Sequence, residues 1–115
     1  MHIQLKRAYD KPSKADGQRI LVDRLWPRGI KKEQAGINLW LKDIAPSKKL
    51  RTWFGHDPAK WTEFKKRYYK ELNHHPDVVN QVAELAAHGK VTLVFGAKDT
   101  EFNNAVALKD YLEKH

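Results

Sequence analysis

Residues 91–97, Val-Thr-Leu-Val-Phe-Gly-Ala, decide the fold, because this run of β-branched and aromatic residues has no polar face. Such a run is typical of a strand that is buried on both sides in a parallel sheet. A second run of this kind lies in residues 19–26, RILVDRLW, and is followed by Pro27, which cannot donate to a strand ladder. We therefore predict that residues 19–25 and 91–96 form neighbouring parallel strands in the interior of a sheet.

The rest of the chain supplies one more strand and several helices. Residues 2–9, HIQLKRAY, alternate as a half-exposed strand does, and the pattern leaves open whether this strand runs antiparallel beside the second one. A short helix is predicted within residues 31–45, and further helices over about residues 48–55, 59–73 and 76–88 and from about residue 104. The helix over residues 59–73 carries an apolar stripe of Trp61, Phe64, Tyr68 and Leu72. Strands separated by helices predict a single α/β domain over residues 1–115, with a small, mainly parallel sheet covered by helices.

The composition narrows the class of protein. The chain has 115 residues and no cysteine, which excludes disulfides, thiolate zinc sites and cysteine nucleophiles. None of the six histidines has the spacing of a zinc helix, and the common phosphate-loop and serine-nucleophile motifs are absent, so we expect no metal and no cofactor. No apolar run approaches the roughly 20 residues that span a bilayer, and the first residues do not resemble a signal peptide. We expect a cytoplasmic protein without membrane association.

The charge distribution points to an anionic partner. The formal net charge is +8, and the basic side chains are concentrated in residues 1–75, whereas residues 76–115 carry more acidic than basic groups. Such a field raises the local concentration of nucleic acids, nucleotides and small phosphates or carboxylates. The partner we expect is therefore an anionic small molecule or a nucleic acid, although a basic surface also serves solubility alone. No oligomeric state follows from the sequence.

Two polar segments follow the two predicted interior strands, at the place where open α/β sheets bind ligands. The first segment contains Asp23, Arg24, Trp26 and Arg28, and the second contains Lys98, Asp99, Asn103 and Asn104. Because the carboxyl ends of parallel neighbours meet at one edge of a sheet, we expect these residues to converge there. A further pair, Ser47 and Arg51, lies at the start of the helix predicted over residues 48–55.

Arginine is the residue type in this set that most favours a phosphate or carboxylate ligand. Arg24 and Arg28 lie on either side of a stiff turn and present planar forks that remain charged at neutral pH. Lys98 adds a cation, and Asn103 and Asn104 open a helix whose free backbone N–H groups also favour anions.

Several of the candidates also have an interpretation that requires no ligand. Trp26 either stacks on a ligand or belongs to the core. Ser47 either binds an anion together with Arg51 or simply caps a helix. Asp23 and Asp99 are the carboxylates best placed to act as a general base, but each lies one residue from a cation, which favours the ionised form and binding over acid–base catalysis.

Three blocks of sequence resemble a known family. They are LVDRLWPRG, then APSKKLRTWFGHDPAKWTEFKKRYYKEL, and then the stretch from Lys98-Asp99 to Asn104-Ala105. Together they resemble the domain of unknown function 488 family, the YeaO-like proteins, from about residue 5 to residue 112. The resemblance implies a small cytoplasmic α/β domain and transfers no catalytic role to any residue.

Three hypotheses for the function follow. The first is a module that binds a phosphate-bearing ligand, a nucleotide or a nucleic acid, through Arg24, Arg28, Arg51 and Lys98. The second is an enzyme that acts on a small anionic substrate at the same edge, with Asp23 or Asp99 as the base. The third is a structural module that binds an acidic protein. A continuous basic stripe favours the first, a deep pocket the second, and a flat apolar patch rimmed by charge the third.

Overall fold

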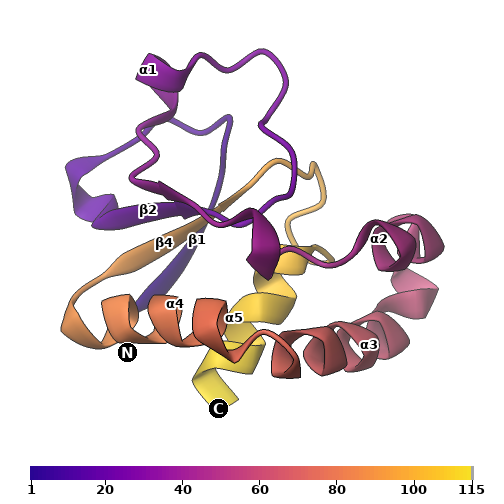
Figure 1. Cartoon of the computed structure of the whole chain (residues 1–115). Helices are drawn as coiled ribbons and strands as arrows, with labels where there is room; N and C mark the ends of the chain where they lie inside the picture. The colour runs from indigo at the N-terminus through magenta and orange to yellow at the C-terminus, as the bar shows by residue number, and fades with distance from the viewer. Residues whose placement is uncertain (115) are drawn as a thin grey trace.

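The computed structural model describes residues 1–114 and contains a four-stranded sheet in the order β1-β4-β2-β3, in which every neighbouring pair is parallel (Figure 1). The strands are β1 (Ile3–Arg7), β2 (Gln18–Leu21), β3 (Leu39–Trp40) and β4 (Val91–Phe95), and the helices are α1 (Lys32–Ala35), α2 (Lys48–Phe54), α3 (Trp61–Asn73), α4 (Pro76–His88) and α5 (Asn104–Lys114). The predicted α/β fold with a small parallel sheet covered by helices is therefore confirmed.

The two strands predicted from the apolar runs are neighbours in the interior of the sheet, as expected. Ile20 of β2 lies opposite Leu93 of β4, and the backbone N–H of Val22 still donates to Val94 at 3.1 Å. The ladder ends there, before residue 25, because the next backbone N–H after β4, that of Gly96, donates to the side-chain carboxylate of Asp23 instead of to a backbone carbonyl. On its other side β4 pairs with β1 in parallel, so the first strand is an edge strand that does not pair with β2.

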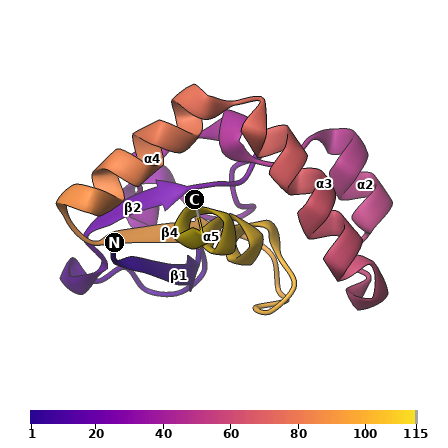
Figure 2. The same cartoon turned by 90° about the horizontal axis from the view of Figure 1, so that it is seen from below.

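The alternation of side chains divides the core between the two faces of the sheet. One face presents Val91, Leu93 and Phe95 to the main core, which includes the inner sides of α3, α4 and α5. Figures 1 and 2 show α4 and α5 against this face and the segment that carries α1 on the opposite side. The opposite face presents Leu21 and Val94 to a smaller cluster. Both interior strands are thus buried on both sides, which explains their uninterrupted apolar sequences.

The apolar stripe of α3 packs as its spacing predicts. Phe64, Tyr68 and Leu72 are buried, and Trp61 is half-buried at the start of the helix. The hydroxyl of Tyr68 donates to the backbone oxygen of Ile44 at 2.6 Å, which satisfies the polar end of a fully buried ring. The stripe therefore holds α3 against the body of the domain.

The short helix predicted within residues 31–45 occupies only the first part of that range. The chain makes the single turn α1, which ends where Gly36 adopts a left-handed conformation with φ of 61°. Residues 39–40 then extend and pair with β2 to form the edge strand β3. The spacing of Leu39, Trp40 and Ile44 is compatible with a helix. The left-handed conformation of Gly36 ends the helix before these residues, and the unpaired edge of β2 then favours a short strand.

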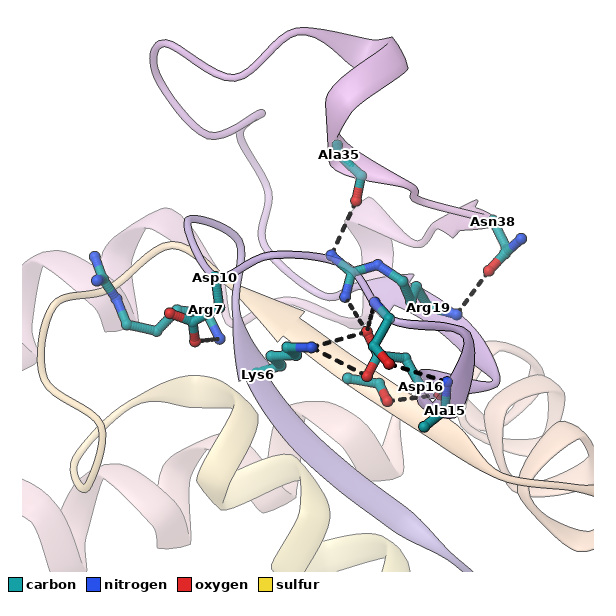
Figure 3. A network of polar contacts seen from close by, with 10 residues as sticks. Lys6, Arg7, Asp10, Ala15, Asp16, Arg19, Ala35 and Asn38 are labelled. Carbon is teal, nitrogen blue, oxygen red and sulfur yellow. Dashed lines mark hydrogen bonds and ion pairs between the residues drawn. The ribbon is translucent and has the colours of Figure 1, made fainter.

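A buried ionic cluster, formed by Lys6, Asp16 and Arg19, lies between the sheet and the α1 segment (Figure 3). Asp16 and Arg19 are 1% and 3% exposed, and the Nη1 of Arg19 donates to the carboxylate of Asp16 at 2.7 Å. Burial raises the pKa of Asp16, but the Ser13 backbone N–H, Lys6 and Arg19 together outweigh burial, and its pKa is lowered. Arg19 also donates to the Ala35 carbonyl at 2.9 Å, so the cluster fastens the α1 segment to the sheet.

Candidate functional site

The carboxyl ends of β2 and β4 meet at a single edge, and a carboxylate ties them together. One oxygen of Asp23 accepts a hydrogen bond from the Gly96 N–H at 2.8 Å, and the other accepts from the side-chain amide of Asn104 at 3.1 Å. The same amide reaches the Val22 carbonyl at 3.1 Å. The two polar segments that follow the interior strands are thus brought together at Asp23 and Asn104.

Asp23 is an electrostatically unusual carboxyl group. Burial raises its pKa, and the Gly96 N–H, the Asn104 amide and the charge of Arg51 lower it only in part, so that the net pKa is raised. Both of its oxygens are engaged in hydrogen bonds to other parts of the chain. The group therefore links β2, β4 and α5, and burial makes its charged form less favourable than that of an ordinary aspartate.

Three arginines line a hollow of about 290 Å³ beside Asp23, which we call the arginine cleft. Arg24 and Arg28 come from the segment after β2, and Arg51 comes from α2. The Nε atoms of Arg24 and Arg51 are buried without a hydrogen-bond partner, and the side chain of Arg28 is exposed. Within residues 1–114, none of these three guanidinium groups makes a hydrogen bond or an ion pair.

A second hollow of about 400 Å³ adjoins the first, and we call it the Phe54 pocket. Its lining comes from the segment after β2, from α2 and α3, and from the start of α5: Leu25, Pro46, Lys48, Arg51, Thr52, Phe54, His56, Phe64, Asn103 and Asn104. The two hollows are adjacent, because both are lined by Arg51, Leu25, His56 and Asn104. Together we call them the depression at the carboxyl edge of the sheet.

Ser47 positions the helix that carries Arg51. Its hydroxyl accepts from the Leu50 N–H at 3.1 Å as an N-cap and donates to Glu71 at 2.7 Å, while its backbone N–H donates to the same carboxylate at 2.8 Å. Ser47 lines neither the arginine cleft nor the Phe54 pocket. Of the predicted pair, therefore, only Arg51 lines the depression.

Trp26 borders the arginine cleft and also belongs to the smaller core cluster. Its indole N–H donates to the Ile30 carbonyl at 2.7 Å, and its ring meets Trp40 edge-on with centroids 5.4 Å apart. Trp40 in turn donates to the Asp23 carbonyl at 2.8 Å. The two tryptophans therefore hold the turn that carries Arg24 and Arg28.

The segment after β4 contributes mainly to the turn that starts α5. Asp99 accepts from the backbone N–H groups of Glu101 and Phe102, which lower its pKa against a smaller opposing effect of burial. Asn103 accepts from the Val106 N–H at 2.9 Å and caps the helix from a buried position. Lys98 is exposed, and neither it nor Asp99 lines the depression. Of this segment, Asn103 and Asn104 reach it.

The sequence did not predict several residues that line the depression, among them His56, Leu25 and Tyr9. His56 lines both hollows and has φ of 56°, the one non-glycine residue with positive φ in the described chain. Leu25 is 69% exposed between them. Tyr9 lines the arginine cleft, and its hydroxyl donates to the Arg28 carbonyl at 2.9 Å. Only the position of Leu25 between Arg24 and Trp26 carried a signal in the sequence.

The depression offers cationic and hydrogen-bonding groups, and nothing in it forms a metal centre. Residues 1–114 contain no group of three or more His, Cys, Asp or Glu side chains that could hold a metal ion. No helix in the same range is long and apolar enough to cross a membrane. The residues of the arginine cleft include three arginines and one carboxyl group, Asp23, whose pKa is raised by burial. This arrangement is suited to holding an anion.

The fold and the depression define a small α/β domain with an arginine-lined carboxyl edge. Residues 2–115 match the family described as the inactive DUF488-N3 subclade, and the chain belongs to this family. It is YeaO-like, which confirms the resemblance seen in the three sequence blocks.

The chain is similar to curated proteins over nearly its whole length. It is 43% identical over 112 residues to the Escherichia coli protein called Uncharacterized protein YeaO, with 97% of each chain covered. It is 37% identical over 110 residues to Uncharacterized protein Rv3073c of Mycobacterium tuberculosis and Uncharacterized protein Mb3100c of Mycobacterium bovis, with 96% of this chain and 92% of each relative covered. No solved structure matches the chain.

Proposed function

We propose that this protein binds a phosphate-bearing anionic ligand in the arginine cleft. The observation that carries the proposal is the division among its six arginines. Arg7, Arg19 and Arg67 lie outside the cleft, and each donates to a carbonyl or a carboxylate. The three that line the cleft make no such bond within residues 1–114. Their guanidinium groups are therefore available to a ligand.

The energetics favour an occupant that accepts hydrogen bonds. A buried donor without a partner costs about 1–3 kcal/mol, and more when it is charged. Arg24 and Arg51 each bury an unpartnered Nε, so an oxyanion in the cleft would offset a penalty that the folded chain carries without it. Phosphate matches the planar fork of arginine, and its charge suits a cleft with three cations and one aspartate.

Binding without turnover fits this site better than acid–base catalysis does. Both oxygens of Asp23 are engaged in links between β2, β4 and α5, and Asp99 is committed to a turn outside the depression. The description of the matching subclade as inactive agrees with a ligand-binding role. The hypothesis of an acidic protein partner has less support, because the unpaired arginines lie in a hollow rather than on a flat surface.

The proposal is tested by Arg→Lys substitutions, which keep the positive charge and remove the planar guanidinium group. We expect inorganic phosphate or a nucleoside phosphate to raise the melting temperature of the parent protein, and to raise that of Arg28→Lys and Arg51→Lys clearly less. Arg67→Lys is the matched control, because Arg67 pairs with Glu63 on the surface of α3. An equal response of all three variants would show that the cleft is not the binding site.

Salt dependence distinguishes a ligand held by the cleft from a nucleic acid spread over the basic surface. Three phosphate contacts predict that affinity for an oligonucleotide falls about 40-fold between 50 and 200 mM salt, whereas six contacts predict a fall of about 10³-fold. The steeper value would locate binding on an extended surface of residues 1–75 rather than in the cleft. Affinities are measured by fluorescence anisotropy with single- and double-stranded oligonucleotides of mixed sequence.

A further inference from the structure

The Phe54 pocket differs chemically from the arginine cleft that it adjoins. Its walls include the apolar side chains of Leu25, Pro46, Phe54 and Phe64 and a single arginine, whereas the cleft contains three arginines and an aspartate beside its own apolar groups. Arg51 lies at the junction, because it lines both hollows. An anion held in the cleft would therefore have an apolar compartment directly beside it.

Exposed apolar side chains are concentrated around the same depression. The large hydrophobic residues exposed in the described chain are Met1, Tyr9 and Leu25. Tyr9 is 48% exposed and lines the cleft, and Leu25 is 69% exposed and lines both hollows. An inorganic ion would not bury these apolar side chains, whereas a ligand with an apolar part would cover them while its anionic part binds the cations.

The inner wall of the Phe54 pocket is aromatic and rigid. The rings of Phe54 and Phe64 stack with centroids 4.3 Å apart and planes inclined by 25°, and both residues are buried. Trp61 supports the pair from behind, with its centroid 5.7 Å from that of Phe64. A flat ligand ring can pack against the part of this wall that lines the pocket.

We propose that the Phe54 pocket holds the base of a mononucleotide whose phosphate is bound in the arginine cleft. This inference rests on the function proposed above and names its ligand class. Thr52, Lys48 and His56 place polar groups around the apolar wall, which suits the heteroatoms at the edge of a nucleobase better than it suits a hydrocarbon chain. The volumes of about 400 and 290 Å³ suit one small molecule rather than a length of strand.

The experiment compares ligands that contain only the phosphate, only the base, or both. Calorimetric titration of the parent protein uses inorganic phosphate, ribose 5-phosphate, nucleosides, nucleoside monophosphates and a short oligonucleotide. We expect at least one nucleoside monophosphate to bind about tenfold or more tightly than inorganic phosphate and ribose 5-phosphate, the factor that about 1.4 kcal/mol of added contact gives. Nucleosides without phosphate are expected to bind weakly.

Two variants locate the base. Thr52→Phe fills the pocket from an exposed position on α2, and Thr62→Phe places the same side chain on exposed α3, away from the depression. We expect Thr52→Phe to abolish the advantage of the nucleotide while inorganic phosphate still binds within about twofold of the parent value. Thr62→Phe is expected to keep the advantage. Leu25→Ala is expected to reduce it, because Leu25 lines both hollows.

The outcomes separate this inference from the proposed function. If phosphate and every nucleotide bind equally, or if Thr52→Phe leaves the advantage of the nucleotide intact, the assignment of the base is wrong and the anion site stands. If neither phosphate nor any nucleotide binds, both proposals fail. If the oligonucleotide binds and no mononucleotide does, the ligand class is wrong. A nucleoside that binds as tightly as its monophosphate would overturn the anion site.

Discussion

The ionic cluster under the α1 segment and the arginine cleft at the carboxyl edge use the same residue type in opposite ways. Arg19 donates from both terminal nitrogens, to Asp16 and to the Ala35 carbonyl, and only its Nε lacks a partner. Arg24 and Arg51 also have buried Nε atoms, but no part of either guanidinium group is hydrogen-bonded within residues 1–114. The comparison teaches that the paired arginine links segments of the fold, whereas the unpaired ones leave their guanidinium groups available, as the proposed anion site requires.

The largest expected effect comes from breaking the paired region. Asp16→Asn leaves Arg19 buried and Lys6 half-buried without their counter-charge, and we expect the free energy of unfolding to fall by roughly 3 kcal/mol or more. Urea denaturation measures the change. Asp110→Asn is the control, because it removes a surface pair with Lys65 at 3.7 Å and should cost less than about 1 kcal/mol. Similar losses in both variants would mean that the cluster does not fasten the α1 segment.

Acid should affect the two regions with opposite signs. The lowered pKa of Asp16 means that its contribution to stability is fully present above the ordinary carboxyl value of 3.8 and is lost as the pH falls through the lower folded value. The raised pKa of Asp23 means that its contribution is present below 3.8 and is lost as the pH rises through the higher folded value.

Unfolding free energies measured from acid to neutral pH test these signs. The difference between the parent protein and Asp16→Asn should shrink as the pH falls below 3.8, and that between the parent and Asp23→Asn should decline as the pH rises above it. Two differences that change in the same direction would show that the environment of Asp23 resembles that of Asp16.

How far the sequence could predict the molecule depends on the range of the interactions involved. The interior strands and the stripe of α3 follow from local periodicity, and the convergence of Asp23 and Asn104 follows from the topology of a parallel sheet. β3 could not be predicted, because a strand of two residues exists only through its pairing with β2.

The site residues divide in the same way. Arg24, Arg28 and Arg51 stand beside turn and cap signals that the sequence displays, and all three line the cleft. His56 and Tyr9 reach the depression through the packing of α2 and of the loop after β1, which no local pattern records. The burial of Asp16 depends on the same kind of long-range approach, since the α1 segment closes over it.

A smaller effect of the opposite sign is expected from the unpaired region. Arg24→Met removes a cation with a buried, unpartnered Nε, and we expect the free energy of unfolding to rise by about 1 kcal/mol while the response to phosphate falls. Arg19→Met makes the same substitution in the paired region and should lower stability by roughly 3 kcal/mol. A loss of stability in Arg24→Met comparable to that in Arg19→Met would erase the distinction between the two regions.

The smallest expected effect concerns the backbone beside the cleft. His56 has φ of 56°, a conformation that costs a residue with a side chain roughly 1 kcal/mol, and such strain persists only where the surrounding structure imposes it. His56→Gly relieves the strain but gives the unfolded chain more freedom, so we expect a gain of less than about 1 kcal/mol. His56→Asn tolerates the same backbone and should leave stability nearly unchanged.

Both variants remove the imidazole that lines the two hollows, so both should weaken phosphate and nucleotide binding measured by calorimetry. A marked loss of stability in His56→Gly, with ligand affinity unchanged, would instead assign the ring to packing against Phe54, whose centroid lies 6.0 Å away. His56 would then be a residue that stabilises the fold, like those of the ionic cluster, and the proposed ligand contacts would be limited to the arginines of the arginine cleft.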